Sequence, residues 1–297
     1  MTILGVAQTA LALHVPPGAC DCHVHVFGPV ERFPFVPERV FTPGPASVED
    51  LLALQRALHL ERVVIVQPSS YGADNACTVD ALRRLGARAR GVAVIDAATG
   101  GAVLQSMHEA GVRGVRVNLE TYGKHDPAVA RELLEDAASR VAALGWHVQT
   151  YTNLAVLDAL HDAIQSLPVP LVVDHFGRPD AALGVSQQGF AALLSLVKSG
   201  KAYVKLSAPH RISAQPDYAD AAAIASALLD ANPDRMLWGT DWPHSGGRPG
   251  VVRRPDVIEP FRREDDGAAL NRLGSWASDA VRLRKILTEN PARLYGF

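Results

Sequence analysis

Eight short apolar segments alternate with helix-like segments along the chain, and this alternation restricts the fold more than any other feature of the sequence. The strand-like segments cover residues 19–28, 62–69, 89–96, 111–119, 146–153, 170–177, 202–208 and 235–243. A strand, a helix and a second strand in succession require a parallel crossover, and eight such repeats close a (β/α)8 barrel. The rival, a doubly wound open sheet, usually has fewer strands and a glycine-rich first turn, which is absent here. We therefore predict an α/β fold of the (β/α)8 TIM barrel type.

The segments between the strands have helical spacing and set the expected limits of the domain. One helix is expected to open at Ser47, and the others to cover 74–87, 101–110, 127–145, 154–167, 190–200 and 218–231. Two irregular stretches, 27–46 and 244–268, elaborate the loops after the first and eighth strands and should lie at the same end of the barrel. We predict a single domain over residues 1–297, with residues 1–16 as an N-terminal extension.

Charge and composition exclude several classes of partner. Lysine and arginine total 29 against 31 acidic residues, a formal charge of −2, which gives no electrostatic reason to expect a nucleic acid or a membrane surface. Three cysteines do not make a disulfide framework. The N-terminus lacks a basic leading segment, so we expect a cytoplasmic protein. The sequence is compatible with a homo-oligomer as well as with a monomer.

The first strand-like segment, "CDCHVHVFG", places two histidines two residues apart. Because side chains alternate along a strand, one face carries Asp21, His23 and His25, and the other carries Cys20, Cys22, Val24 and Val26. The apolar set suits the layer of helices. We therefore expect the aspartate and both histidines to point into the barrel.

Other candidate functional residues follow other strands. His175 and Asp241 come at the ends of the sixth and eighth strand-like segments, in "VVDHFG" and "GTDWPH". Active sites of such barrels lie at the carboxyl ends of the strands. Each residue alone could be structural, but imidazoles and a carboxylate that converge on one barrel mouth indicate a catalytic site.

Several motifs in order carry a resemblance to a known family. The chain contains "DCHVHVFGP", "VRVN", "DHFGRPD", "VKLSAPHR", "GTDWPH" and "ENPARLYGF". From about residue 17 to the C-terminus it resembles the amidohydrolase superfamily. Within that superfamily it is similar to the amidohydrolase-2 group, which includes lactone hydrolases and an isomerase of sugar-acid lactones. The resemblance implies an enzyme that acts on a carboxylic ester bond.

The resemblance also bears on metal content. Metal-dependent superfamily members use the HxH pair, a Lys or Glu on the fourth strand, histidines on the fifth and sixth, and the aspartate on the eighth. Here Arg116 and Asn118 stand near the end of the fourth strand and Tyr151 on the fifth. His147 lies four residues earlier, too deep to join the cluster. We expect catalysis without metal; the alternative is one zinc ion held by His23, His25 and Asp241.

The remaining site residues follow from metal-free lactone hydrolysis. Asp241 is the expected general base, while His23, His25 and His175 would donate hydrogen bonds to the substrate carbonyl. A di- or polyacid lactone should bind to Arg116, Arg178 and Arg211. Further substrate contacts are expected from neutral or weakly basic groups: Tyr151, Asn118, Ser69, Tyr71 and His244. Lys205 is expected lower in the barrel, paired with Asp21.

Three other functions remain open at this stage. The same residues could isomerise a sugar-acid lactone, with a substrate hydroxyl in place of water. With a zinc ion, they could serve a mononuclear decarboxylase, hydratase or hydrolase of the same superfamily. The third alternative is a non-catalytic protein that binds acids on a barrel scaffold.

Overall fold

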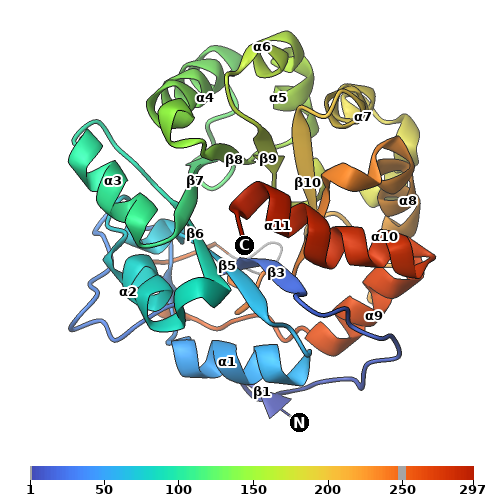
Figure 1. The fold of residues 1–297 in the computed structure, drawn as a ribbon, viewed down its shortest axis with the longest axis horizontal. Coiled ribbons are helices and arrows are strands. Elements are labelled where there is room, and N and C mark those ends of the chain that lie inside the picture. The colour runs from blue at the N-terminus through green and yellow to red at the C-terminus, as the bar shows by residue number, and fades with distance from the viewer. Residues whose placement is uncertain (1, 247–251) are drawn as a thin grey trace.

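The strands form the parallel barrel that the alternation predicts. The computed structural model describes residues 2–246 and 252–297. The barrel strands are β3 (Cys20–Val24), β5 (Arg62–Val66), β6 (Ala89–Ala93), β7 (Val112–Asn118), β8 (His147–Tyr151), β9 (Leu171–Val173), β10 (Ala202–Ser207) and β11 (Met236–Gly239). They pair in parallel in chain order, and a parallel bridge between Val24 and Trp242 joins the two edges. The (β/α)8 fold is confirmed (Figure 1).

Helices surround the barrel. Those between the strands are α1 (Val48–Ala57), α2 (Ala76–Leu85), α3 (Gly101–Glu109), α4 (Pro127–Val141), α5 (Leu154–Ala159), α6 (His161–Ser166), α7 (Phe190–Lys198) and α8 (Ala221–Ala231). The helix predicted over 154–167 is thus two helices that meet at Leu160. Short turns of 3-10 helix are η1 (Ser69–Tyr71), η2 (Gly86–Arg88), η3 (Ala142–Leu144), η4 (His175–Gly177), η5 (Ala181–Ser186), η6 (Pro209–Arg211) and η7 (Pro233–Arg235). Within the described part of the chain, no helix combines the length and apolar character needed to cross a membrane.

The C-terminal helices close the end of the barrel where the strands begin. They are α9 (Asp266–Ala277), α10 (Ala280–Arg284), the π-helical turn η8 (Lys285–Glu289) and α11 (Asn290–Tyr295). Figure 1 shows α11 lying across the barrel, with the C-terminus near its centre. Tyr295 is fully buried there, with its ring 5.2 Å from that of His147. The carboxyl ends of the strands, where the candidate functional residues are expected, therefore lie at the opposite end.

The predicted start of the first helix is confirmed by its cap. Oγ of Ser47 accepts a hydrogen bond from the backbone N–H of Asp50, and the Asp50 carboxylate accepts one from the backbone N–H of Ser47. This reciprocal capping box satisfies two backbone donors that the first turn would otherwise leave free. The cap fixes where the first insert ends.

The first strand departs from the alternation that its sequence predicts. Cys20 and Cys22 lie in the barrel interior with Val64, Val66 and Leu237, whereas Val24 and Val26 face the helices. The expectation that both cysteines face the helix layer is wrong. The pairing of β3 with β5 shifts register between Asp21 and Val24, and such an irregularity reverses the faces. His23 still lies inside.

Two inserts cover the barrel mouth, as predicted, and they pair with each other. β4 (Thr42–Pro43) in the first insert is parallel to β12 (Ile258–Glu259) in the second. Phe27 and Ala46 exchange two backbone hydrogen bonds that draw the ends of the first insert together. The predicted loop 244–268 includes residues 247–251, which lie outside the described residues, and α9 begins before that loop was expected to end.

The N-terminal segment packs on the outside of the barrel. It begins with a small hairpin of β1 (Thr2–Ile3) and β2 (Val6–Ala7). Backbone N–H groups of Thr9 and Ala12 then donate to the side chains of Asp265 and Asn271. A Cβ at Gly267 would lie 2.1 Å from the carbonyl oxygen of Thr9, so this close approach to α9 requires glycine.

Candidate active site

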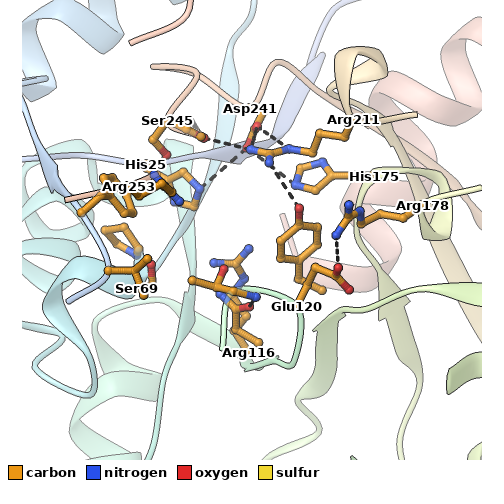
Figure 2. Close-up of a pocket in the computed structure, with 17 residues that line it drawn as sticks. His25, Ser69, Arg116, Glu120, His175, Arg178, Arg211, Asp241, Ser245 and Arg253 are labelled. Atoms are coloured by element: carbon orange, nitrogen blue, oxygen red, sulfur yellow. Dashed lines mark hydrogen bonds and ion pairs between the residues drawn. The ribbon is translucent and has the colours of Figure 1, made fainter. Parts of the chain in front are cut away.

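A cavity of about 270 Å³ opens at the carboxyl ends of the barrel strands. Most of the predicted residues line it: His25, Ser69, Arg116, Asn118, Tyr151, His175, Arg178, Arg211 and Asp241. Figure 2 shows Asp241 on one side and Arg116 on the opposite side. The structure adds residues that the sequence did not suggest: Val40, Phe41, Glu120, Ser245 and Arg253. Four of these five belong to the two inserts.

Two predicted substrate contacts are not on the cavity wall. Tyr71 is buried in an aromatic cluster with Phe27 and Phe35, and its hydroxyl accepts from the backbone N–H of Gly28. Nε2 of His244 lies 3.2 Å from the carboxylate of Asp266, in a separate cavity. Neither residue lines the cavity, because the Tyr71 hydroxyl and Nε2 of His244 have their contacts away from the mouth.

Asp241 lies at the centre of the predicted catalytic group. Its Oδ1 atom lies 3.5 Å from Nε2 of His23 and 3.8 Å from Nε2 of both His25 and His175. Its Oδ2 atom accepts from Nη2 of Arg211 at 2.7 Å. The structure therefore brings the three imidazoles and the carboxylate together. Oδ1 has no hydrogen-bond donor among the described residues, so it is free to act on a bound molecule.

The contacts of His25 define which of its nitrogens carries the proton. Nδ1 lies 2.7 Å from the carbonyl oxygen of Val66, and a carbonyl can only accept. Burial lowers the pKa of His25 to about 3, so the ring is neutral and Nε2 holds a lone pair. His25 can then accept a hydrogen bond from water, but it cannot donate one to a substrate carbonyl. The predicted donor role does not fit this residue.

His175 has a partner that permits donation. Nδ1 of His175 lies 2.9 Å from the hydroxyl oxygen of Ser207, which can either donate or accept. If Ser207 donates, Nε2 of His175 carries the proton and faces the cavity. Burial holds the pKa of His175 well below its usual range. His175 is therefore the histidine that suits donation as a neutral ring.

Asp174 connects His23 to the barrel interior, and the sequence did not single it out. Its Oδ1 atom lies 3.2 Å from Nδ1 of His23 and 3.5 Å from Nζ of Lys205. Lys205 also donates to Oε1 of Gln149 at 2.7 Å. The predicted pairing of Lys205 with Asp21 is wrong. Asp21 instead accepts from the backbone N–H and hydroxyl of Thr240.

Backbone conformation explains why Asp174 was missed. Strict alternation would place Asp174 and His175 on opposite faces. In the structure β9 ends at Val173, and His175 and Phe176 take left-handed backbone conformations with φ of 51° and 59°. Asp241 has φ of 67° as well. Such conformations are uncommon outside glycine and often occur at functional sites.

The buried charges hold both carboxylates ionised. Burial alone would raise the pKa of Asp241, but Arg211 holds it well below its usual range. Burial likewise opposes ionisation of Asp174, whereas His23 and Lys205 keep its pKa well below the ordinary value. Burial and Lys205 lower the pKa of His23. The site therefore combines anionic carboxylates with neutral imidazoles.

The three predicted arginines differ in how many donors they leave free. Arg211 uses Nε, Nη1 and Nη2 on Asp241, Tyr151 and the carbonyl of Ser245. Arg178 forms a close ion pair with Glu120, and its buried Nε has no partner among the described residues. Arg116 makes one long contact, 3.4 Å from Nη2 to Asp174, and its buried Nε has no partner among the described residues. Among the described residues, Arg116 lacks the close carboxylate contact that Arg178 and Arg211 have, so it is the arginine best able to bind a new anion.

The ring of Tyr151 lies among all three guanidinium groups. The distances from the guanidinium carbons to the ring centre are 5.7 Å for Arg116, 5.4 Å for Arg178 and 5.5 Å for Arg211. The tyrosine hydroxyl accepts from Nη1 of Arg211 at 3.2 Å. Its own proton is then available to a molecule in the cavity.

Three side chains fit one metal ion. The ligand atoms of His23, His25 and Asp241 lie within 4.8 Å of one another, and ligands of a tetrahedral zinc ion are about 3.3–3.5 Å apart. Nε2 of His23 and Oδ1 of Asp241 are buried without a partner in the described residues. The set therefore fits a single ion with one open position. Arg116 and Tyr151 stand where a second ion would need ligands.

Comparisons with known proteins place the chain among characterised enzymes. The family model described as "Amidohydrolase" matches residues 20–297. A 2-pyrone-4,6-dicarboxylate hydrolase of Comamonas testosteroni is 39% identical over 291 residues, which cover 95% of this chain and 91% of the relative. A 4-sulfomuconolactone hydrolase of Rhizobium radiobacter is 37% identical over 288 residues, 96% and 92% of the two chains.

A relative with another activity is more distant. A D-galactarolactone isomerase of Agrobacterium fabrum is 28% identical over 284 residues, which cover 94% of this chain and 91% of the relative. All three similarities extend over 94% or more of this chain.

Proposed function

Because the chain belongs to the amidohydrolase family, we propose that it opens the ring of a carboxylated lactone by attack of water. The substrate class is a small ring ester that carries two acidic groups, of the pyrone dicarboxylate or muconolactone type. The names of the two relatives above 35% identity support this class.

The arrangement around Asp241 carries the proposal. Its Oδ1 atom is unpartnered among the described residues and faces Nε2 of His23 and of His25 at 3.5 and 3.8 Å. His25 offers a lone pair at that nitrogen, since its proton lies on Nδ1. A water molecule between these acceptors would donate to both the carboxylate and the imidazole. Its oxygen would then be oriented for attack, with Asp241 as the general base.

The reaction follows from this placement. Asp241 takes a proton from water as the water oxygen bonds to the lactone carbonyl carbon. The bond between that carbon and the ring oxygen then breaks, and the ring oxygen receives the proton from Asp241. The product is an open-chain hydroxy acid, or its keto form, with one more carboxylate than the substrate.

Two neutral donors are positioned to stabilise the negative charge that develops on the carbonyl oxygen. The Tyr151 hydroxyl has a free proton because its oxygen accepts from Arg211. Nε2 of His175 can carry a proton when Ser207 donates to Nδ1. Fixed donors in a site that excludes water contribute strongly to catalysis of acyl transfer.

The acidic groups of the substrate would be recognised by guanidinium groups. Arg116 has free donors, and its side chain is only 6% exposed, so a bound carboxylate meets little competition from water. Arg178 and Arg253 line the same cavity. Both already pair with carboxylates, those of Glu120 and Glu259. We therefore assign the first substrate carboxylate to Arg116.

We further propose that hydrolysis proceeds without a metal ion. Arg211 already supplies the positive charge that balances Asp241, at 2.7 Å, and Tyr151 and His175 supply donors to the carbonyl. An ion held by His23, His25 and Asp241 would polarise the carbonyl and acidify the water. Exhaustive chelation should leave kcat/KM within about twofold, and elemental analysis should find well below one ion per chain. Chelator-sensitive turnover restored by zinc would refute this point.

The decisive test replaces the base. Asp241→Asn should lower kcat for a pyrone dicarboxylate or muconolactone by about 10²- to 10⁴-fold, the usual contribution of a general base. The matched control, Asp256→Asn, changes an exposed aspartate of the second insert that pairs with Arg254 and should leave kcat unchanged. If Asp241→Asn hydrolysed every accepted lactone at the normal rate, the assignment would be lost.

Isomerisation of a lactone is the second candidate, and the similarity to the galactarolactone isomerase favours it. The same groups would serve, with a substrate hydroxyl in the place of water. Turnover in H₂¹⁸O separates the two reactions. Hydrolysis must place one ¹⁸O atom in each product molecule, whereas isomerisation places none.

A further inference from the structure

A second cavity, of about 190 Å³, adjoins the first. The two cavities have Ser69, Arg116 and Asn118 in common. Figure 2 shows Ser69 and Arg116 on the side of the first cavity away from Asp241. A ring held with its carbonyl at Asp241 would therefore direct its far side toward the second cavity.

Aliphatic side chains form one wall of this second cavity, which lies between the barrel strands and α4. They are Val94 and Ile95 after β6, Val115 and Val117 on β7, and Leu133 and Ala137 on α4. Ile95, Val117 and Leu133 are only partly buried, although they pack against the core. The protein thus leaves aliphatic surface uncovered directly beside the candidate active site.

The polar groups of the second cavity are already engaged or lie at its edge. Nε2 of Gln67 donates to the carbonyls of Gly72 and Asp74, and its Oε1 accepts from Thr78. Lys124 and Asp136 are exposed. Three lining residues, Ser69, Arg116 and Asn118, form the wall that the two cavities share. The aliphatic wall away from Arg116 therefore suits an apolar group.

We propose that this second cavity, which we call the annex, binds an apolar substituent of the lactone, carried on a ring position remote from the carbonyl. The inference rests on the proposed lactone hydrolysis and narrows its substrate class to rings with an aryl or short alkyl arm. An apolar cavity of about 150 Å³ can hold benzene, so the annex has room for a phenyl group.

Binding of a ring that cannot react tests the annex without turnover. Cyclohexane-1,3-dicarboxylate and its 5-phenyl derivative would be titrated into the protein by calorimetry. We expect the phenyl derivative to bind at least about tenfold more tightly, because the phenyl group loses its contact with water. Equal or weaker binding of the phenyl derivative would overturn the proposal.

A variant whose side chain fills the annex provides a second test of the proposal. Leu133→Trp should reduce the phenyl advantage to less than about threefold and leave binding of the parent diacid unchanged. The matched control is Leu194→Trp, because Leu194 on α7 is also partly buried against the core but lines neither cavity. If Leu133→Trp fails to fold, Ile95→Phe should give the same loss. A full phenyl advantage in the filled variants would overturn the proposal.

The two levels of inference fail in different ways. Normal hydrolysis of carboxylated lactones without any phenyl advantage would remove the annex assignment and leave the proposed function intact. If the protein opened no lactone but showed a phenyl advantage that Leu133→Trp abolished, the proposed function would be lost and the annex assignment would stand.

Discussion

The carboxylate of Asp174 lies 3.2 Å from Nδ1 of His23, and neither side chain is exposed to solvent. The same carboxylate lies 3.5 Å from Nζ of Lys205 and 3.4 Å from Nη2 of Arg116. One buried anion thus orients a histidine beneath the cavity and balances two cations. Because an unpaired charge in a dry interior is costly, these contacts depend on one another.

Asp174→Asn should therefore lower both stability and activity. It keeps the size of the side chain but removes the charge that balances Lys205, so we expect a loss of about 3–5 kcal/mol in the free energy of unfolding. We also expect kcat to fall about tenfold to a hundredfold, since His23 loses its anchor. Urea denaturation and steady-state kinetics measure the two effects.

A double-mutant cycle with Lys205→Met separates the buried ion pair from other effects. Each single variant leaves one charge alone, whereas Asp174→Asn with Lys205→Met removes both. The double variant should be more stable than the sum of the single losses predicts, by at least about 1 kcal/mol. Strict additivity would show that the two residues do not depend on each other.

Arg116→Gln should weaken substrate binding more than it slows the chemical step. A charge-assisted hydrogen bond in a buried site contributes about 1.5–3 kcal/mol, so we expect kcat/KM to fall about tenfold to a hundredfold, mainly through KM. Arg113→Gln, on the same strand, is the control, because Arg113 bonds to the carbonyls of His108 and Val112 and is not among the residues of the cavity. An equal loss in both variants would argue against a substrate contact.

His25 should remain a neutral ring with its proton on Nδ1 throughout the working pH range. Burial lowers its pKa to about 3, and the Val66 carbonyl retains the Nδ1 proton. In ¹⁵N NMR spectra of the imidazoles, His25 should show this tautomer without change from pH 5 to pH 8. A transition near pH 6.5 would contradict the buried geometry.

His147 should contribute to acid sensitivity. Burial lowers its folded-state pKa to about 3, whereas an unfolded histidine titrates near 6.5. Between these values the unfolded state binds more protons, so stability rises with pH over that window and falls on acidification. His147→Phe should reduce the slope of unfolding free energy between pH 4 and pH 6 by about 1.4 kcal/mol per pH unit. An unchanged slope in His147→Phe would contradict this prediction.

The barrel and its mouth could be predicted because both depend on periodic patterns. Eight alternating segments define the strands, and residues at the strand ends converge whatever the details of the loops. That placed His25, His175 and Asp241 at one cavity. The bulge in β3 places Cys20 and Cys22 in the barrel interior. This could not be predicted, because a register shift leaves no mark in the sequence of a strand.

The missed residues depend on irregular backbone and on contacts between distant loops. Asp174 faces inward in alternation with Val172, and the left-handed turn at His175 brings the next side chain to the same site. Arg253 and Phe41 meet across 212 positions of sequence, with the guanidinium carbon 3.7 Å from the ring centre. No local pattern could predict that contact. Tyr71 and His244 do not line the cavity, because a polar residue near a strand end can turn away from the mouth.

The parallel pairing of β4 with β12 has a consequence for how this barrel can be altered. Thr42–Pro43 and Ile258–Glu259 come from opposite ends of the chain, yet each supplies the hydrogen-bonding edge of the other. A chimera that took one of these loops from a relative would leave an unmatched edge over the mouth. We therefore expect that substrate selectivity can be transferred between such enzymes only when both loops are exchanged together.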